Sequence, residues 1–566
     1  MTKQLITSAL LYVNGLPHLG HLVGCLLPAD VYARYLRSQG EDVLFIGGTD
    51  EHGTVAEVGA TKENMDVADY CKKYHDIHRE MYRGFNLSLD YCGRTSSEQN
   101  KEITYRIFEA LDKNGLIEEK TTKQVYSPDD GRYLPDSYVI GTCPHCGYEK
   151  AKGDQCENCT KILDPTDLIN PKSVLSGSSN LEIRETRHLF LQLPKMEEEL
   201  NQWIETKRGI WPDIAYSIAK KWLKEGLQER GITRDLKWGF SVPKEGFENK
   251  VFYVWFDAPI GYIGITKQWS DEKPTERNWA DWWLKPEEVR YTEFMGKDNI
   301  PYHTISFPAT LKGTGESWKT VDFLKGMNYL NFAGGKFSKS AHRGIFLDDA
   351  IKEFPADYWR YWLIANAPES DDTNFSFEQF AAVINKDLND VLGNFINRVL
   401  KMTEKNFGNQ VPAIGSLTEN ETELYQTLDN LIADYRRYMD GLEFRKAMGA
   451  LREIWVSGNN YIAKTEPWKV VKTDQAYGAT ILGTALNMIR LFANLAAPVM
   501  PESAEKMLAL IGEEPKAQWP TDKMEVYLKQ IPAGRAFTPS DPLFQKIAPE
   551  RVEELKINYK ESENQA

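Results

Sequence analysis

The fold is decided by residues 4–53, which read QLITSALLYVNGLPHLGHLVGCLLPADVYARYLRSQGEDVLFIGGTDEHG. QLITSALL is an apolar run with β-branched residues and predicts a buried strand, and NGLPHLGH is typical of a tight turn that enters an amphipathic helix. EDVLFIGG predicts a second strand, parallel to the first. Such a βαβ unit binds ligands at the carboxyl ends of its strands, where residues 12–21 and 47–53 lie.

The composition describes a globular chain of several domains. Its 566 residues correspond to about three or four domains of ordinary size. Hydrophobic residues make up 42% and charged residues 27%, which excludes a mostly disordered, fibrous or membrane-spanning protein. The net charge of −14 argues against a generally basic nucleic-acid binder but leaves room for a local basic face. Because the N-terminus lacks a signal peptide, we expect a cytoplasmic protein without a membrane partner.

The pattern changes several times further along the chain. Short strand and turn signals indicate an insertion, after which the α/β pattern resumes. Apolar residues at three-to-four spacing between about 385 and 510 predict a helix bundle, and the polar C-terminal residues predict a frayed tail. The expected units are the α/β halves 1–114 and 231–320, the insertion 115–230, a loop region 321–385, the bundle 386–545 and the tail 546–566.

Four of the seven cysteines predict a metal site in the insertion. Cys143, Cys146, Cys156 and Cys159 form two CxxC pairs separated by nine residues, CPHCGYEKAKGDQCENC. Two such turns suit the tetrahedral thiolate ligation of one zinc ion, and a closed four-sulfur shell is structural because it leaves no open position. His145 is then not expected to be a ligand. The alternative is a set of free thiols or disulfides.

HLGH (18–21) places two imidazoles three residues apart where the predicted turn enters its helix. Both rings then lie on one face near the positive end of the helix dipole. Gly20 lets a flat ligand approach the backbone closely. This arrangement suits phosphate oxygens that gain charge in a transition state, although a pair of ordinary surface or core histidines is the alternative.

KFSKS (336–340) follows two glycines and carries Lys336 and Lys339 on a polar loop. Ammonium groups on such a loop can clamp phosphate as point charges. Taken alone, the segment could equally be a solvated basic loop. Together with HLGH, roughly 300 residues earlier, it forms a specific pair.

VWFDAPIGY (254–262) is predicted to lie at the end of a strand. An aromatic wall with a small residue and a proline suits a slim, flexible thioether side chain. Asp50 in TDEHG (49–53) is a carboxylate that could orient a substrate ammonium group. The alternatives are ordinary core aromatics and a loop carboxylate or helix cap.

The pair HLGH and KFSKS resembles the two signatures of the class I aminoacyl-tRNA synthetases. Nearly the whole chain is similar to the methionyl-tRNA synthetase family within that class. Besides the cysteine pairs, the shared segments are FIGGTDEHGT (45–54), ITRDLKWG (232–239), VWFDAPIGY, FMGKDN (294–299), GKFSKS (335–340), GNFINR (393–398) and EPW (466–468).

The resemblance implies a methionine–tRNA ligase. Such an enzyme activates L-methionine with Mg-ATP to methionyl-adenylate and pyrophosphate. It then transfers the methionyl group to the 3′ terminal adenosine of tRNA(Met), initiator tRNA included. The implied fold is a Rossmann-like parallel-sheet catalytic domain with a zinc-knuckle insertion, a stem-contact region at 321–385 and an α-helical anticodon-binding bundle. We expect a monomer, since the chain shows no additional OB-fold module.

The resemblance also assigns residues to the site. Catalysis is implied at His18, His21, Lys336 and Lys339. The implied ATP site comprises Asn14, His18, Gly20, His21, Arg234, Gly296, Asp298 and Lys339. The implied methionine pocket comprises Leu10, Tyr12, Asp50, Trp255, Ala258, Pro259, Tyr262, Asn299 and His303. The CAU anticodon is implied to dock at Asp387, Asn394, Arg398 and Trp468, of which the first three recur on one face of a regular helix.

Three other functions stay open on the sequence alone. Another class I amino-acid specificity is the nearest, but the leucyl, isoleucyl and valyl enzymes carry a longer editing insertion, and a cysteinyl enzyme would use zinc in its active site. A second is an HxGH nucleotidyltransferase, against which the helical C-terminal half argues. A third is a zinc-containing RNA-binding protein without catalysis, against which intact HLGH and KFSKS argue. For Arg234, the alternative to a role in the ATP site is a surface ion pair with Asp235.

Overall fold

The centre of the molecule is a parallel β-sheet. The computed structural model describes residues 3–153, 156, 158, 159, 161, 163–335, 337, 343–538 and 542–561. The strands follow the order β15-β14-β1-β3-β2, with β4 also paired to β3, and all these pairs are parallel. They are β1 (Lys3–Ser8), β2 (Leu11–Tyr12), β3 (Val43–Asp50), β4 (Tyr91–Arg94), β14 (Val289–Gly296) and β15 (Phe323–Met327). The predicted βαβ unit is confirmed, and β1 lies where the strand order reverses, the usual position of a ligand crevice.

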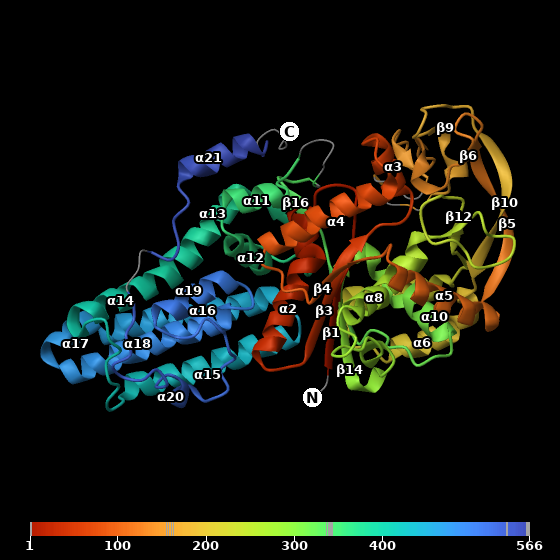
Figure 1. The fold of residues 1–566 in the computed structure, drawn as a ribbon. Helices are drawn as coiled ribbons and strands as arrows, with labels where there is room; N and C mark the ends of the chain where they lie inside the picture. The colour runs from red at the N-terminus through yellow and green to blue at the C-terminus, as the bar shows by residue number, and fades with distance from the viewer. Residues whose placement is uncertain are drawn as a thin grey trace.

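Helices cover both faces of this sheet (Figure 1). They include α1 (Leu19–His21), the π-helical η1 (Leu22–Leu26), α2 (Leu27–Ser38), α3 (Thr54–Lys62), α4 (Val67–Gly84), α5 (Glu98–Lys113), α8 (Val254–Asp271), α9 (Ala280–Trp283) and α10 (Phe307–Gly313). One prediction was wrong here. VWFDAPIGY forms the first turns of α8, whereas the strand β13 (Val251–Phe252) ends before it. Because α8 is buried on nearly every side, its apolar run has no polar face that would distinguish a helix from a buried strand.

Residues 117–191 form an antiparallel unit beside the sheet. The long strands β5 (Ile117–Ser127) and β10 (Glu182–Leu191) pair along their whole length, and a three-stranded sheet carries the cysteine turns. Val125, Tyr138 and Val139 belong to a small core separate from the main one. The other elements are β6 (Arg132–Tyr133), β7 (Val139–Thr142), β8 (Ala151–Lys152), β9 (Ile169–Ser173), α6 (Glu197–Glu205), α7 (Asp213–Glu225), β11 (Arg230–Gly231) and β12 (Thr233–Arg234).

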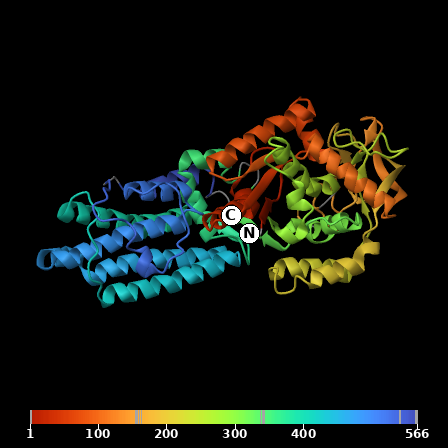
Figure 2. The same ribbon diagram turned by 60° about the horizontal axis from the view of Figure 1, so that its bottom comes forward.

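The C-terminal half is helical, as the periodicity predicts, and forms an elongated bundle at one side of the sheet (Figures 1 and 2). A connecting region precedes it, with β16 (Leu330–Phe332), α11 (Leu347–Glu353), α12 (Ala356–Ala365), β17 (Thr373–Phe375), α13 (Phe377–Val383) and the π-helical η8 (Ile384–Gly393). The bundle comprises α14 (Asn394–Phe407), α15 (Glu419–Asp440), α16 (Phe444–Thr465), α17 (Pro467–Thr473), α18 (Gln475–Ala496), α19 (Pro501–Leu510) and α20 (Met524–Tyr527).

Helix α18 is the one described helix that is long and apolar enough to cross a bilayer. Its apolar window is 89% buried within the molecule. The helix is therefore the central core helix of the bundle, and it packs against α14, α16, α17 and α19.

The expected frayed tail is wrong for its described part. Residues 549–558 form helix α21 (Pro549–Asn558), which packs on α13. Val552 and Leu555 are buried, and the Tyr559 hydroxyl donates to Glu353 at 2.9 Å. The segment is polar because only a narrow stripe of it is covered, and a short amphipathic helix of this kind gains its stability from tertiary packing.

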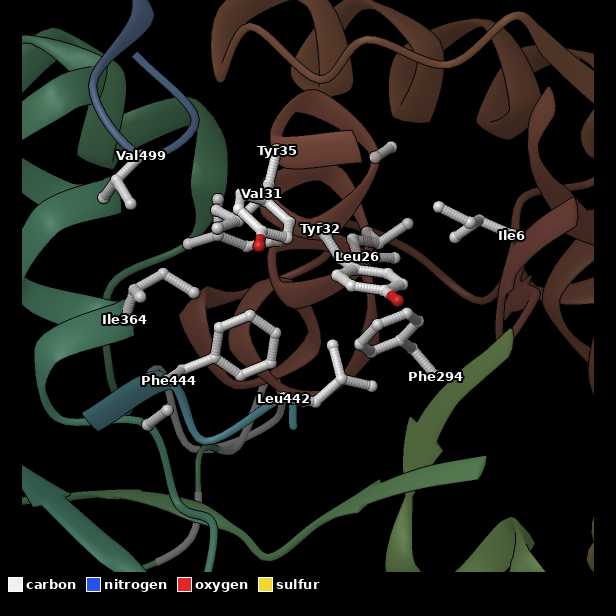
Figure 3. Close-up of a cluster of buried hydrophobic side chains, with 14 of the residues drawn as sticks. Ile6, Leu26, Val31, Tyr32, Tyr35, Phe294, Ile364, Leu442, Phe444 and Val499 are labelled. Atoms are coloured by element: carbon white, nitrogen blue, oxygen red, sulfur yellow. The ribbon is translucent and has the colours of Figure 1, made fainter. Parts of the chain in front are cut away.

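An apolar cluster joins the sheet domain to the bundle (Figure 3). Tyr32 from α2 and Phe294 from β14 lie beside Leu442, in the turn before α16, and Phe444, the first residue of α16. The rings of Phe294 and Phe444 are 6.4 Å apart between centroids. The main core is thus continuous from the parallel sheet into the bundle.

Candidate functional site

A cavity of about 440 Å³ opens at the carboxyl ends of β1, β3 and β14. Every residue predicted for the methionine pocket lines it. These residues are Leu10, Tyr12, Asp50, Trp255, Ala258, Pro259, Tyr262, Asn299 and His303. From the predicted ATP site, Asn14, His18, Gly20, His21 and Gly296 line the same cavity. The tertiary structure therefore brings together residues from both halves of the sheet domain in one enclosed space.

The HLGH turn is organised by its own side chains. His18 is the N-cap of α1, where its Nδ1 accepts the Gly20 N–H at 3.1 Å, and His21 Nδ1 accepts the His18 N–H at 3.1 Å. In each neutral ring the proton then lies on Nε2, which is a hydrogen-bond donor. The two rings are 3.8 Å apart between centroids. A Cβ at Gly20 would come within 2.9 Å of the His18 ring, so this position requires glycine.

The second signature reaches the first one through Phe337. The Phe337 ring stacks on His18 at 4.5 Å between centroids and 8° between planes, and it lines the cavity. The backbone N–H of Leu347 donates to Pro17 at 3.0 Å, so the chain returns to HLGH on the far side of the loop. The segments that were expected to meet thus do meet. Lys336 and Lys339, with the two serines of KFSKS, lie outside the described residues.

Asp50 is a buried carboxylate that faces the cavity. It is 4% exposed, and its Oδ1 has no hydrogen-bond partner among the described residues. Burial, and then the nearby carboxylates of Asp257 and Glu51, raise the pKa of Asp50 well above its usual range. Glu51 is itself neutralised by Arg94 at 2.8 Å. Among the described residues no lysine or arginine pairs with Asp50, and a ligand ammonium group would supply that positive charge.

His303 and Tyr262 form a neutral wall of the cavity. The His303 Nδ1–H donates to the Asn299 carbonyl at 2.9 Å, so Nε2 accepts the Tyr262 hydroxyl at 3.0 Å. Burial lowers the pKa of His303 to about 4 and raises that of Tyr262 well above its usual range. Both side chains are uncharged at neutral pH and hydrogen-bond each other, so this wall suits an apolar ligand.

Trp255 completes the pocket with an aromatic stack. Its ring lies on Tyr302 at 3.9 Å and 13°, and the Tyr12 ring meets it edge-on at 6.4 Å. Arg230 from the insertion lies 5.0 Å from the Tyr302 ring. Stacking fixes the orientation of Trp255, so the wall of the pocket is preorganised.

Of the predicted ATP residues that the structure describes, Asp298 and Arg234 are not among those that line the cavity. Asp298 accepts a hydrogen bond from the hydroxyl of Tyr329, a residue that does line it. The Arg234 guanidinium stacks on Tyr253 at 3.6 Å. The alternative of an ion pair between Arg234 and Asp235 does not describe the structure, because Asp235 pairs with the buried Lys250 at 2.5 Å.

Sequence reasoning missed the part of the cavity that follows β15. Residues 328–331 line it, although they carry no charged group that marks them as a site. Their position along the chain could have indicated them, because they follow a strand that is parallel to β14 and therefore lie at the same edge of the sheet. Cys25 and His78 also line the cavity and were not predicted, and His78 Nε2 lies 2.9 Å from the Gly15 carbonyl.

The cysteine cluster has the dimensions of a metal site. All four sulfur atoms lie within 4.8 Å of one another, with Cys143 and Cys159 3.8 Å apart and Cys146 and Cys156 3.6 Å apart. A tetrahedron with metal–sulfur bonds of about 2.3 Å has edges of about 3.8 Å. The cluster therefore fits a tetrahedrally coordinated metal ion.

The predicted anticodon residues are only partly together. Trp468 is 37% exposed, and the Arg398 guanidinium lies 5.5 Å from its ring, with Asn394 exposed on the same helix α14. Asp387 instead accepts Arg452 Nε at 2.7 Å and the Tyr361 hydroxyl at 3.1 Å. The π-helical winding of η8 lies between Asp387 and Asn394, so the spacing of a regular helix does not apply across it.

Comparison with known proteins identifies the family. The family model for class I tRNA synthetases (M) matches residues 4–400, and the model for the anticodon binding domain of methionyl tRNA ligase matches residues 411–564. Methionine–tRNA ligase of Streptomyces avermitilis is 52% identical over 99% of both chains. Methionine–tRNA ligase 1 of Acaryochloris marina is 51% identical over 98% of this chain and 99% of its own.

A solved structure agrees with these relatives. Mycobacterium tuberculosis methionyl-tRNA synthetase in complex with methionyl-adenylate superposes with a TM-score of 0.77 at 25% identity, covering 96% of this chain and all of that one. The chain therefore belongs to the methionyl-tRNA synthetase family of the class I aminoacyl-tRNA synthetases.

Proposed function

We propose that this chain is a methionine–tRNA ligase that works in two steps at the cavity below HLGH. In the first, the carboxylate of L-methionine attacks the α-phosphorus of ATP, bound as its magnesium complex, and pyrophosphate leaves. In the second, a hydroxyl of the 3′ terminal adenosine of tRNA(Met), initiator tRNA included, attacks the methionyl-adenylate, and AMP leaves. The observation that carries the proposal is the stacking of Phe337 on His18 beside a cavity that contains Asp50.

The cavity has complementary ends for the two halves of the adenylate. Asp50 would bind the methionine ammonium group, and the thioether would lie against Trp255, Tyr262 and His303. The Tyr262 hydroxyl and His303 Nε2 already hydrogen-bond each other. The Nε2–H groups of His18 and His21 would donate to the phosphates. Such fixed donors stabilise charge that develops in the transition state without reorganisation.

The loop lysines supply the remaining charge in this proposal. Lys339 would bind the departing pyrophosphate, with Lys336 in support. We expect Lys339→Ala to lower the rate of methionine-dependent ATP–pyrophosphate exchange at least about tenfold, equivalent to about 1.4 kcal/mol of barrier. Methionine binding, measured by calorimetry, should stay unchanged, because in the proposed role the lysine would contact the phosphates and not methionine. Near-normal exchange in the variant would contradict the role.

The metal in the insertion would be one zinc ion held by Cys143, Cys146, Cys156 and Cys159, which the sulfur spacing supports. When bound, zinc would cross-link the knuckle and supply no chemistry to the reaction. Trp468 and Arg398 would stack and contact the CAU anticodon, with Asn394 and Asp387 as further candidates. An exposed aromatic plane beside a guanidinium is a typical platform for unstacked RNA bases.

The remaining expectations stay predictions. The family models divide near residues 400–411, which supports a catalytic part and an anticodon-binding part close to the expected boundary at 386. The finer boundaries, a monomeric state and a cytoplasmic location are proposed on the sequence arguments alone.

ATP–pyrophosphate exchange with each of the twenty amino acids, followed by charging of tRNA(Met) transcripts, tests the function. Exchange with methionine alone and charging of tRNA(Met) support it. Exchange with another amino acid would favour a different class I specificity. Release of a nucleotide conjugate of another small molecule without tRNA would favour a nucleotidyltransferase, and no ATP turnover would favour a plain RNA-binding protein.

A further inference from the structure

A short segment connects the bundle to the nucleotide side of the cavity. Residues 368–375, which we name the bridging segment, follow α12 and end with β17. Figure 1 shows α16 running from the sheet domain toward α17 at the far end of the bundle. The 22 residues of α16 span about 33 Å. Trp468 lies just beyond its C-terminal end, so the helix is a rigid rod between the proposed anticodon site and the sheet domain.

Glu369 of the bridging segment holds the N-terminal end of α16. Its Oε1 accepts the Phe444 N–H at 3.0 Å, and its Oε2 accepts the Arg445 N–H at 2.9 Å. These are two of the N–H groups that a helix cannot satisfy internally, and a carboxylate there also meets the positive end of the helix dipole. The side chain belongs to a different part of the chain, so this cap ties α16 to the segment.

The same carboxylate binds the central sheet. Lys325 Nζ on β15 donates to Glu369 Oε1 at 2.7 Å, with both side chains largely buried. Lys325 is paired in register with Phe294, whose ring lies beside that of Phe444 in the cluster of Figure 3. The end of α16 is thus held at one point by a charge pair, two backbone hydrogen bonds and an aromatic contact.

The backbone at Glu369 then leads to the cavity wall. The Asn328 N–H donates to the Pro368 carbonyl at 2.8 Å, and Asn328 Nδ2 donates to the Glu369 carbonyl at 3.3 Å. Asn328 lines the cavity, and its Oδ1 accepts Lys297 Nζ at 3.1 Å. A shift of Glu369 would therefore reach the segment that carries Gly296 and Asn299.

The rest of the bridging segment reaches the KFSKS loop. Asp372 Oδ1 accepts the Tyr329 N–H and Lys297 Nζ, each at 3.0 Å. β17 pairs with β16, which contains the cavity residue Leu330. The Asn374 Oδ1 accepts the N–H of Gly334 at 2.7 Å, immediately before the loop. One stretch of eight residues thus contacts α16, the cavity wall and the base of the loop.

We propose that Glu369 is a positioning residue through which the bundle helix α16 sets the nucleotide side of the active site when tRNA is bound. The inference rests on the proposed function, because it takes Trp468 to contact the anticodon. The Glu369 side chain touches neither the cavity nor the anticodon platform. Its link to the cavity wall is the backbone carbonyl that accepts Asn328 Nδ2, which a side-chain substitution keeps, and Asp372 holds Lys297 and Tyr329 separately. Loss of the carboxylate should therefore affect the steps that use tRNA and leave the tRNA-independent step nearly unchanged.

The test compares Glu369→Ala with Glu443→Ala. Glu443 is the N-cap residue of the same helix, but its half-exposed side chain pairs with Lys446 and caps no N–H group among the described residues. We expect Glu369→Ala to keep tRNA-independent ATP–pyrophosphate exchange within about twofold and to lower kcat/KM for tRNA(Met) about tenfold or more, a typical size for coupling between sites. Glu443→Ala should change neither. Should Glu369→Ala fold poorly, Glu369→Gln provides the same test with a smaller loss, since its carboxamide oxygen still accepts one N–H.

A double-mutant cycle with Trp468→Ala separates this inference from the proposed function. If the anticodon acts through Glu369, kcat/KM of the double variant for tRNA(Met) should lie within about twofold of that of the less active single variant. The inference would be overturned if the losses of the two single variants multiplied in the double variant. It would also be overturned if Glu369→Ala lowered pyrophosphate exchange as much as charging, or left charging unchanged. Normal charging by Trp468→Ala alone would overturn the proposed anticodon site, while the comparison of Glu369 with Glu443 would still decide the coupling.

Discussion

Burial disfavours the charged forms of single residues in the cavity. Asp50 is buried next to two other carboxylates, of which Glu51 pairs with Arg94 and Asp257 lies 2.5 Å from His52 Nδ1. The raised pKa of Asp50 means that burial and the neighbouring carboxylates disfavour its ionised form. In the proposed function, an ammonium group bound beside Asp50 would offset that cost, so the same residue would select a zwitterionic amino acid.

Asp50→Asn should weaken methionine binding and leave ATP binding nearly unchanged. A hydrogen bond to a charged group contributes about 1.5–3 kcal/mol, so the methionine KM in pyrophosphate exchange should rise by about tenfold to a hundredfold. The ligand-free variant should melt at a higher temperature than the wild type at pH 7.5. A group with a raised folded pKa stabilises the fold only at low pH, so this difference should shrink as the pH falls. An unchanged methionine KM would contradict the assignment.

The pH dependence of stability should report His303. Its folded pKa of about 4 lies below the ordinary value, so the folded state stays neutral while the unfolded chain takes up a proton below about pH 6.5. Stability from this group is therefore complete above pH 6.5 and is lost as the pH falls toward 4. Between pH 7.5 and 5, wild type should lose about 2 kcal/mol more unfolding free energy than His303→Asn in urea titrations. Parallel pH profiles would contradict this.

At the scale of elements, the knuckle insertion is fastened to the helix that follows the Asp50 loop. Glu57 on α3 accepts the backbone N–H groups of Lys237 and Trp238 at 3.0 and 2.8 Å. It also accepts Arg132 of the insertion at 2.9 Å and the hydroxyl of Tyr138. One carboxylate thus joins three separate segments, and the order of the knuckle should influence the position of α3.

Cys143→Ser should abolish metal binding in the insertion. Wild-type protein should contain one zinc ion per chain by elemental analysis, and the variant should contain almost none, because three thiolates leave the shell incomplete. Limited proteolysis should then cut between residues 139 and 173. Cys92→Ser, which changes a cysteine outside the cluster, is the matched control and should keep its metal. Retention of zinc by Cys143→Ser would rule out the four-sulfur site.

At the scale of the whole molecule, a buried ion pair joins the sheet domain to the bundle. Arg360 on α12 is fully buried and donates to Asp30 of α2 at 2.6 Å. It also donates to the carbonyls of Phe85 at 2.9 Å and of Val499 at 2.7 Å, which lie in the two different domains. The domains therefore share one polar joint as well as the apolar cluster of Figure 3.

Arg360→Met should destabilise the whole protein strongly. Removing one member leaves the Asp30 charge buried without its main partner, which costs about 3–5 kcal/mol. Combining it with Asp30→Asn should recover part of the loss, because the buried charge is then removed as well. Thermal melting of the two variants and of Asp30→Asn measures this. A double variant that is as unstable as the sum of the single variants would contradict the pairing.

The sequence by itself determined the local elements and the chemistry of the site. Periodicity and turn residues are properties of neighbouring amino acids, so the βαβ unit, the bundle helices and the CxxC turns could be predicted directly. The resemblance then supplied the cavity residues from Leu10 to His303. Where burial erased the periodicity, as in α8, or where a polar segment is covered on one side, as in α21, the prediction was wrong.

Only the tertiary structure decided which distant residues meet. Phe337 on His18, Glu369 on the end of α16, and Asp30 on Arg360 are contacts between segments far apart in the chain. The burial that shifts the pKa of Asp50 and His303 likewise exists only after the sheet, α8 and β14 have packed together. Such contacts and the low local dielectric arise from packing in three dimensions, and no pattern of neighbouring residues encodes them separately.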